Sequence, residues 1–360
     1  MNITLFLGAG ASVQFGNPAT KGFKEQLLEK NLLGDYFSLV LKPFPDIEHV
    51  LECIKEIQEL NKKEHLTKFL YNDEFDFEVK SRLPSIKIES PSIRLFMNEG
   101  KTIHEQIMHN LFEIYRIRED QELSVRNFFN SLFSLIIKYT KQIHIGTTNY
   151  DLAVEEFCKS QGSGHSIVDG FEMVGKEITW KPEVFQKNDS PDFIKLYKIH
   201  GSLNWQSDRG ILTRLPFMPE FRSADNRMSS VVIAPTLSPK EALEKEPFST
   251  ILSLYSEKLQ KSDVCIVIGF SFRDGDISDH FRTFVQNGKQ LIIISPDCHR
   301  DYLVNLCKEY GHVQDYGAIK EIADQHARSN GRNVKLIDLP CDEKNNEVVF
   351  RKIESFLPRT

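Results

Sequence analysis

Ile3 to Ser12 reads ITLFLGAGAS, a short apolar run that passes directly into two closely spaced glycines. A nearly continuous apolar strand is typical of a parallel sheet whose two faces are both covered by helices. Glycines after such a strand let the backbone approach a diphosphate, and the next helix offers free N–H groups at its N-terminus. The residues placed for this contact are Gly8, Ala9, Gly10 and Ser12. Because Val13 replaces the third glycine of G-x-G-x-x-G, a strand-to-helix turn without a ligand stays open as the alternative.

The same pattern recurs along the chain as apolar or β-branched runs that end in small or polar residues. The further expected strands are Gln142–Ile145, Lys195–Ile199, Val231–Ala234, Val264–Ile268, Leu291–Ile294 and Val334–Leu339. Helical periodicity follows several strands, at Leu152–Cys158, Phe248–Leu259, Ile277–Gln286 and Tyr302–Cys307, and a last helix is expected at Asn345–Phe356. This alternation predicts an α/β fold with a doubly wound, Rossmann-like parallel sheet.

The region between the first two expected strands has a different character. It contains helix-like segments and no clear buried strand; these segments are Phe23–Glu29, Ile47–Leu60, Ile103–Arg116 and Val125–Tyr139. Residues 71–91 have the composition of a loop or hairpin, and residues 205–230 that of an irregular excursion with a short hairpin. We therefore expect a Rossmann domain formed by residues 1–20 and 140–360, interrupted by a helical insertion at residues 21–139.

Composition narrows the class of protein. The chain has 360 residues, of which 40% are apolar and 27% charged, so it is an ordinary globular protein rather than a disordered one. Its 45 basic and 51 acidic residues give a net charge of −6, which weighs against a phosphate backbone as the main ligand. The cysteines form no C-x-x-C pair, which fits a reducing cytoplasm better than a zinc ribbon or disulfide framework. They are Cys53, Cys158, Cys265, Cys298, Cys307 and Cys341. Neither a signal peptide nor a membrane span is expected.

Polar residues follow three later strands at their expected carboxyl ends, where a doubly wound sheet binds its ligands. They are Thr148, Asn149 and Asp151 after one strand, His200 and Gly201 after another, and Gly269 and Ser271 after a third. An asparagine offers both a donor and an acceptor to sugar hydroxyls or a water. A histidine held by a rigid strand is suited to act as a general base near neutral pH.

Each of these motifs also has a purely structural interpretation. Thr148 or Asp151 alone could cap the next helix, although capping does not explain Asn149. A single histidine such as His200 is more often a satisfied core or turn residue. Asp274 to Asp276 could cap the helix that follows Gly269, without any ligand nearby. The occurrence of all these motifs at strand ends, in series, favours a nucleotide site.

The ordered series resembles the sirtuin superfamily, and within it the bacterial sirtuin-like branch that consumes NAD in anti-phage defence. The resemblance covers residues 1–12 and about 140–300, and leaves the helical insertion unaccounted for. It implies a diphosphate contact for Gly8, Ala9, Gly10 and Ser12, and a nicotinamide-ribose contact for Thr148, Asn149 and Asp151. It implies a catalytic role for Asn149 and His200, an adenosine contact for Gly269 and Ser271, and a place beside the adenine for Ser295.

Two departures from the superfamily bear on the reaction. The sirtuin Pro-Asp-Phe-Arg segment is absent, because the chain continues Val13-Gln14-Phe15-Gly16-Asn17-Pro18. The four zinc cysteines of protein deacylases are also absent. The resemblance therefore implies an NAD⁺ hydrolase that releases nicotinamide and ADP-ribose, with NAD as substrate and no metal. It further implies a cytoplasmic homo-oligomer held inactive until triggered by a separate partner, such as a hexameric translocase ATPase or a short Argonaute.

Three other functions remain to be distinguished. An NAD-dependent protein deacylase would require an acylated peptide for turnover. A non-catalytic module that senses NAD or ADP-ribose would use the same glycines, but would have no particular need for both Asn149 and His200. For a nuclease or nucleic-acid-binding role, the sequence shows no cluster of metal-ligand carboxylates, and the net negative charge weighs against it.

Overall fold

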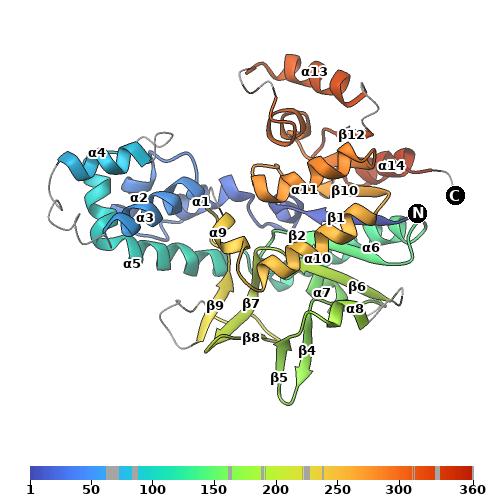
Figure 1. Cartoon of the computed structure of the whole chain (residues 1–360), viewed down its shortest axis with the longest axis horizontal. Coiled ribbons are helices and arrows are strands. Elements are labelled where there is room, and N and C mark those ends of the chain that lie inside the picture. The colour runs from blue at the N-terminus through green and yellow to red at the C-terminus, as the bar shows by residue number, and fades with distance from the viewer. Residues whose placement is uncertain are drawn as a thin grey trace.

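The computed structural model describes residues 1–61, 73–82, 88–160, 164–187, 190, 192–220, 222, 228–236, 239–309, 311, 313–328 and 333–358. Within these ranges the chain forms a seven-stranded parallel sheet in the order β12-β11-β10-β1-β2-β6-β3 (Figure 1). Its strands are β1 (Ile3–Leu7), β2 (Ile143–Thr147), β3 (Ser166–Val168), β6 (Phe193–Lys198), β10 (Val264–Ile268), β11 (Gln290–Ile294) and β12 (Val334–Ile337). The predicted doubly wound α/β fold is confirmed.

The apolar run that opens the chain forms the central strand. Leu5 of β1 is in register with Ile145 of β2 on one side and with Ile266 of β10 on the other. Every residue of β1, β10 and β11 is buried, which explains why these strands read as continuous apolar runs. The chain goes from β1 to one half of the sheet and returns to the other half at β10. The strand order therefore reverses between β1 and β10, where such sheets form their ligand crevice.

Helices cover both faces of this sheet, because alternate strand residues point to opposite faces. One face packs against α6 (Glu122–Ile136), α7 (Ala153–Lys159) and α14 (Asn346–Phe356). The other packs against α10 (Phe248–Lys261), α11 (Gly275–Gln286), α12 (Cys298–Arg300), the π-helical turn η4 (Asp301–Leu306) and α13 (Tyr316–Arg328). No helix among the described residues combines the length and apolar character needed to cross a membrane.

A second group of helices has a core of its own beside the sheet (Figure 1). It consists of α1 (Thr20–Glu29), α2 (Asp35–Leu41), α3 (Ile47–Asn61), α4 (Asp73–Arg82) and α5 (Ser90–Ile114). Its core reaches the sheet through Tyr115, Tyr150 and Leu203. We call α1 to α5 the helical wall; α6, which follows it, packs on the sheet instead.

The prediction of a loop or hairpin at residues 71–91 is wrong for residues 73–82, which form α4. Lys80 and Arg82 lie in its last turn, where positive charge complements the helix dipole. Residues 71–72 and 83–87 lie outside the described part of the chain.

A five-stranded antiparallel sheet in the order β4-β5-β8-β7-β9 was not predicted. Its strands are β4 (Phe171–Val174), β5 (Glu177–Trp180), β7 (Gly201–Asp208), β8 (Ile211–Arg214) and β9 (Met228–Val232). The expected parallel strand Val231–Ala234 is therefore wrong, since β9 pairs antiparallel with β7. The short hairpin expected within residues 205–230 is confirmed: β7 and β8 form a hairpin around Arg209 and Gly210, whose positive φ angles of 50° and 82° suit a tight two-residue turn.

The remaining described elements are short and connect the larger ones. They are the 3₁₀ turns η1 (Ala9–Phe15) and η3 (Glu119–Gln121) and the helices α8 (Val184–Lys187) and α9 (Lys240–Leu243).

Candidate functional site

A cleft of about 600 Å³ opens at the carboxyl ends of the central strands, between the parallel sheet and the helical wall. The structure brings nearly all of the predicted site residues to this cleft. Those that line it are Ala9, Gly10, Ser12, Thr148, Asn149, Asp151, His200, Gly269, Ser271 and Ser295. Gly8 is the exception, because it lies beneath the lining, in the contact between two loops.

Three glycines allow the loops after β1 and β10 to pack directly against each other. A Cβ atom on Gly8 would lie 2.5 Å from the carbonyl oxygen of Gly269, and one on Gly10 would lie 2.8 Å from the Cα of Gly269. Gly269 itself has a φ of +66°, and its Cβ would lie 2.3 Å from the amide nitrogen of Ala11. The Gly10 amide donates a 2.9 Å hydrogen bond to the Gly269 carbonyl. These glycines therefore allow the two loops to pack together at the point where the strand order reverses. The sequence pattern alone did not predict this packing role.

Ser12, Asn149 and Asp151 form one hydrogen-bonded chain at the cleft. The Ser12 hydroxyl donates to Asp151 Oδ2 over 2.7 Å and accepts from Asn149 Nδ2 over 3.0 Å. Asp151 Oδ1 accepts from the backbone N–H of Ala153 at the start of α7, so Asp151 also has the capping role. The remaining amide oxygen of Asn149 is buried and has no hydrogen-bond partner among the described residues. This chain fixes the Asn149 amide and leaves its oxygen able to accept a hydrogen bond from a ligand.

A buried lysine holds the backbone of this motif in place. Lys198, at the end of β6, donates to the carbonyls of Tyr150 and Asp151, and its Nζ lies 3.2 Å from Glu155 Oε1. Burial raises the pKa of Glu155, while the Lys198 charge opposes that rise. Sequence reasoning missed Lys198, although a lysine within a strand expected to be buried is itself a signal that a buried partner exists.

His200 faces a carboxylate at the opposite side of the crevice. Its Nε2 lies 3.3 Å from Asp274 Oδ2, without the alignment of a hydrogen bond, and neither atom has another partner among the described residues. The other oxygen of Asp274 accepts from the Ile277 amide and caps α11, which confirms the predicted capping role. Gly201 has a φ of +84°, and its Cβ would lie 2.4 Å from the Val231 carbonyl oxygen, so the turn after His200 requires glycine.

The helical wall contributes charged groups that no sequence motif indicated. Arg273, in the loop after β10, places Nη1 3.4 Å from Glu48 Oε2 and 3.6 Å from Asp46 Oδ2, both at the start of α3. Burial raises the pKa of Glu48, and the Arg273 charge opposes that rise. Glu48, Tyr115 and Arg273 all line the cleft. These contacts join residues that are more than two hundred positions apart, so no local pattern could predict them.

The far end of the cleft, beside β11, contains a buried acid. The Ser295 hydroxyl donates a 2.8 Å hydrogen bond to Asp301 Oδ2, and both residues line the cleft. Burial raises the pKa of Asp301 to about 6. Asn305 donates to the Ser271 carbonyl over 2.7 Å, which ties the loop after β10 to the same segment. The cleft therefore has a histidine-containing end near β6 and an acidic end near β11.

Part of the chain is similar to a known family of protein domains. Residues 143–314 match the family model described as a SIR2-like domain. This match covers the loops with Asn149, His200 and Gly269. No curated protein sequence matches the chain significantly.

Several solved structures are similar over nearly the whole chain. A crystal structure of a Sir2 homolog–NAD complex is 14% identical, covering 98% of this chain and 90% of that one, with a TM-score of 0.43. An ADP-ribose complex of a Sir2 homologue variant is 15% identical, with coverages of 99% and 94% and a TM-score of 0.43. A 2′-O-acetyl ADP ribose complex of another variant is 13% identical, with the same coverages and TM-score.

Proposed function

We propose that the chain hydrolyses NAD⁺ at the bond between nicotinamide and ribose, releasing nicotinamide and ADP-ribose. The observation that carries the proposal is a set of buried polar atoms in one cleft that have no hydrogen-bond partner among the described residues: Asn149 Oδ1, His200 Nε2 and Asp274 Oδ2. Buried polar atoms are normally hydrogen-bonded, so these three support a polar ligand at this end of the cleft. The match of residues 143–314 to a SIR2-like domain supports NAD as that ligand.

The chemistry of the bond sets what the site must supply. Nicotinamide leaves with the electron pair of the C1′–N bond and becomes neutral, so it needs no proton from an acid. The ribose carbon becomes electron-poor, and a water must reach it on the exposed face. The reaction consumes NAD⁺ and water and yields nicotinamide, ADP-ribose and one proton. A site for this reaction needs to hold the ribose, position a water and accept the proton.

The residues at the histidine-containing end can fill these roles. Asn149, fixed by Ser12, would hold a ribose hydroxyl or the attacking water through its free amide oxygen. His200 would accept the proton, and the nearby Asp274 carboxylate would stabilise the imidazolium that forms. The loops after β1 and β10 would hold the diphosphate.

The first test is nicotinamide release from NAD⁺ by the purified chain without any acylated peptide. We expect His200→Ala and Asn149→Ala to lower the rate by ~10²-fold or more, the usual scale for acid–base and positioning groups. His109→Ala, which changes an exposed histidine on α5, is the matched control and is expected to keep full activity. Unchanged release in both site variants would contradict the proposal.

The same assay separates the two competing functions. Turnover that appears only when an acylated peptide is added would make the chain a protein deacylase. Tight NAD binding without turnover, even with a candidate defence partner added, would make it a sensing module. We also propose that the hydrolase acts in anti-phage defence as a cytoplasmic homo-oligomer triggered by a separate protein, such as a translocase ATPase or short Argonaute. A chain that stays monomeric in light scattering at working concentration would count against the oligomer.

A further inference from the structure

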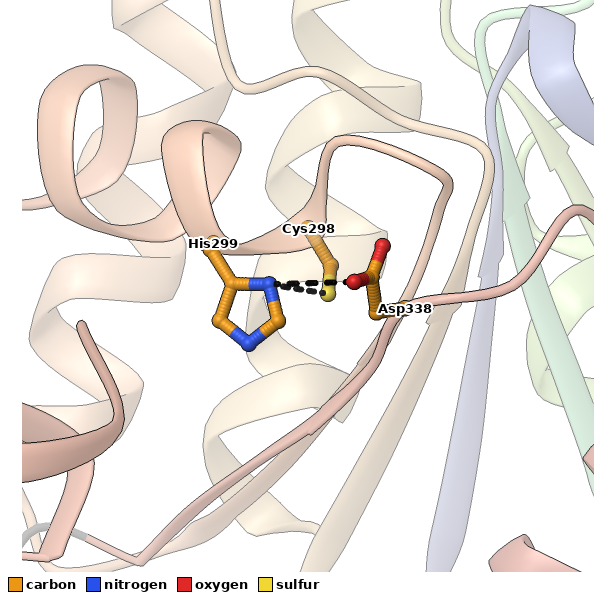
Figure 2. A group of neighbouring side chains, drawn as sticks. All are labelled: Cys298, His299 and Asp338. Carbon is orange, nitrogen blue, oxygen red and sulfur yellow. Dashed lines mark hydrogen bonds and ion pairs between the residues drawn. The ribbon is translucent and has the colours of Figure 1, made fainter. Parts of the chain in front are cut away.

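A compact group of ligand-type side chains lies outside the histidine-containing end of the cleft (Figure 2). Cys298 and His299 open α12, after β11, and Asp338 follows β12. Cys298 Sγ lies 3.6 Å from His299 Nδ1, and that nitrogen lies 3.8 Å from Asp338 Oδ2. Cys298 and His299 are fully buried, whereas the Asp338 side chain keeps 26% of its surface exposed. The three groups therefore converge on one point that is open to solvent from the Asp338 side.

A fourth residue determines how His299 presents its nitrogens. The other ring nitrogen, Nε2, lies 3.3 Å from Asp324 Oδ1 of α13. Asp324 is the nearer of the two carboxylates that face the ring, and its contact is an ion pair without a printed hydrogen bond, so it favours the ring proton on Nε2 and the lone pair on Nδ1. The lone pair then faces Cys298 and Asp338. A carboxylate behind a histidine is the usual outer partner of a metal-binding imidazole.

We propose that Cys298, His299 and Asp338 bind a zinc ion, with a water in the fourth position. Tetrahedral bonds of about 2.3 Å to sulfur and 2.0 Å to nitrogen give a sulfur–nitrogen separation of about 3.6 Å. The observed separation is 3.6 Å. A thiolate is a soft ligand that favours zinc over magnesium or calcium, and a mixed set of sulfur, nitrogen and oxygen is typical of zinc. The sequence predicts no metal, because its cysteines form no paired motif.

Binding would exchange a proton for the ion. With the ring proton on Nε2, the metal-free Cys298 thiol donates to His299 Nδ1. A zinc–sulfur bond forms as the thiol proton leaves to solvent, and a zinc–nitrogen bond takes up the Nδ1 lone pair. The ligand set of thiolate, imidazole and carboxylate then neutralises the two positive charges of the ion.

One positive group competes for Asp338. Lys320 of α13 places Nζ 3.2 Å from Asp338 Oδ2, the oxygen that faces His299, and it is half exposed. The other oxygen, Oδ1, accepts from the Tyr316 hydroxyl over 2.9 Å and stays fixed. Because the Lys320 side chain is long and partly in solvent, it can move away when zinc arrives. Replacing it should therefore strengthen zinc binding.

A zinc ion at this position would affect the structure of the cleft. Pro296 and Asp297, which precede the cluster, line the acidic end of the cleft. The Tyr316 hydroxyl oxygen also lies 3.1 Å from the Pro296 carbonyl oxygen. A zinc ion would join this segment to the end of β12 and fix the wall of the cleft beside β11. Its role is therefore to stabilise the fold at this end of the cleft.

The test uses the purified full-length chain, first treated with a chelator, and Zn²⁺ or Co²⁺ alone as the probe. We expect one tightly bound Zn²⁺ per chain, release of protons on binding, and a thiolate-to-cobalt charge-transfer band. Asp324→Asn is expected to weaken zinc binding by ~10–100-fold, as for other outer partners of metal-bound histidines. Cys298→Ser is expected to abolish the cobalt band.

Two further variants keep the test independent of folding defects in the ligand variants. Cys307→Ser changes a half-buried cysteine outside the cluster and should keep the band and the affinity. Lys320→Met should raise zinc affinity several-fold. A band that persists in Cys298→Ser, or zinc affinity that is unchanged in both Asp324→Asn and Lys320→Met, would overturn the proposal. Because no readout depends on NAD turnover, its outcome is separate from that of the proposed hydrolase.

Discussion

The two walls of the cleft are built in different ways. On the sheet side, the chemical groups stand on loops fixed by buried contacts, such as the hydrogen bond from Gly10 to Gly269 and that from Ser12 to Asp151. On the helical side, the charged contact with the sheet runs through Arg273, whose side chain is 47% exposed. Rigid loops suit groups that must be held to a fraction of an ångström. The proposed catalytic residues Asn149 and His200 therefore stand on the rigid side of the cleft.

The largest expected effect tests the rigidity of the sheet side. Gly269→Ala would place a Cβ atom 2.3 Å from the backbone nitrogen of Ala11, on a residue whose φ is +66°. Overpacking and backbone strain together should lower the free energy of unfolding by about 5 kcal/mol. Gly275→Ala is the control, because its Cβ meets no atom within 4 Å and its φ is not positive. Urea unfolding checks both; equal stability of the two variants would show that the loops separate easily.

The next effect concerns the buried lysine under the Asn149 motif. Lys198→Met leaves Glu155 buried without its counter-charge and leaves two carbonyls without their donor. Breaking a buried pair from one side should lower the free energy of unfolding by about 4 kcal/mol. Adding Glu155→Gln should restore part of the loss, since the uncompensated charge is then removed. A double variant no more stable than Lys198→Met in urea would assign the loss to the carbonyls alone.

The sequence predicted the sheet side far better than the helical side, and the reason is the range of the interactions. Strands β1 and β10 are buried on both faces, so each appears in the sequence as a continuous apolar run. The run ends directly before Gly8 in one case and before Gly269 in the other, which made the strand ends easy to locate. The antiparallel sheet was not predicted because β9 is half buried along its whole length. Only the apolar residues at its C-terminal end resemble a buried parallel strand.

The site shows the same limit. Asn149 and His200 follow strands and were found, because the carboxyl ends of parallel strands meet at one edge. Glu48 and Asp301 were not found, because each depends on a partner that the fold brings from elsewhere. Asp274 was predicted only to cap a helix, which it does, and its position opposite His200 was not predicted.

A smaller effect tests the acidic end of the cleft. The pKa of Asp301 is raised to about 6, so its ionised form is less stable in the folded chain than in the unfolded one. The stabilisation that comes from the protonated form is present below about pH 4 and is lost as the pH rises through about 6. Asp301→Asn keeps an acceptor for Ser295 and carries no charge. At pH 8 it should therefore raise the free energy of unfolding by about 3 kcal/mol.

The measurement is urea unfolding of both proteins at pH 4 and pH 8. The difference between them should be near zero at the lower pH and grow toward the higher one. Ser355→Ala, on the exposed side of α14, serves as a control that should show no such pH dependence. A constant difference across this range would mean that Asp301 keeps an ordinary pKa in the folded chain.

The smallest effect addresses the helical side directly. Arg273→Gln removes the positive charge between Asp46 and Glu48, but nearly half of the Arg273 side chain lies in water. Such partly exposed pairs contribute little, so the free energy of unfolding should fall by less than about 1 kcal/mol and the loss should shrink in high salt. Arg351→Gln, which breaks an exposed pair with Glu347, gives the matched background. Because burial already raises the pKa of Glu48, losing the opposing charge of Arg273 should raise it further. A loss of stability that is independent of salt and well above that of Arg351→Gln would mean that the helical wall is held to the sheet as firmly as the sheet loops are held to each other. The two walls would then not differ in rigidity.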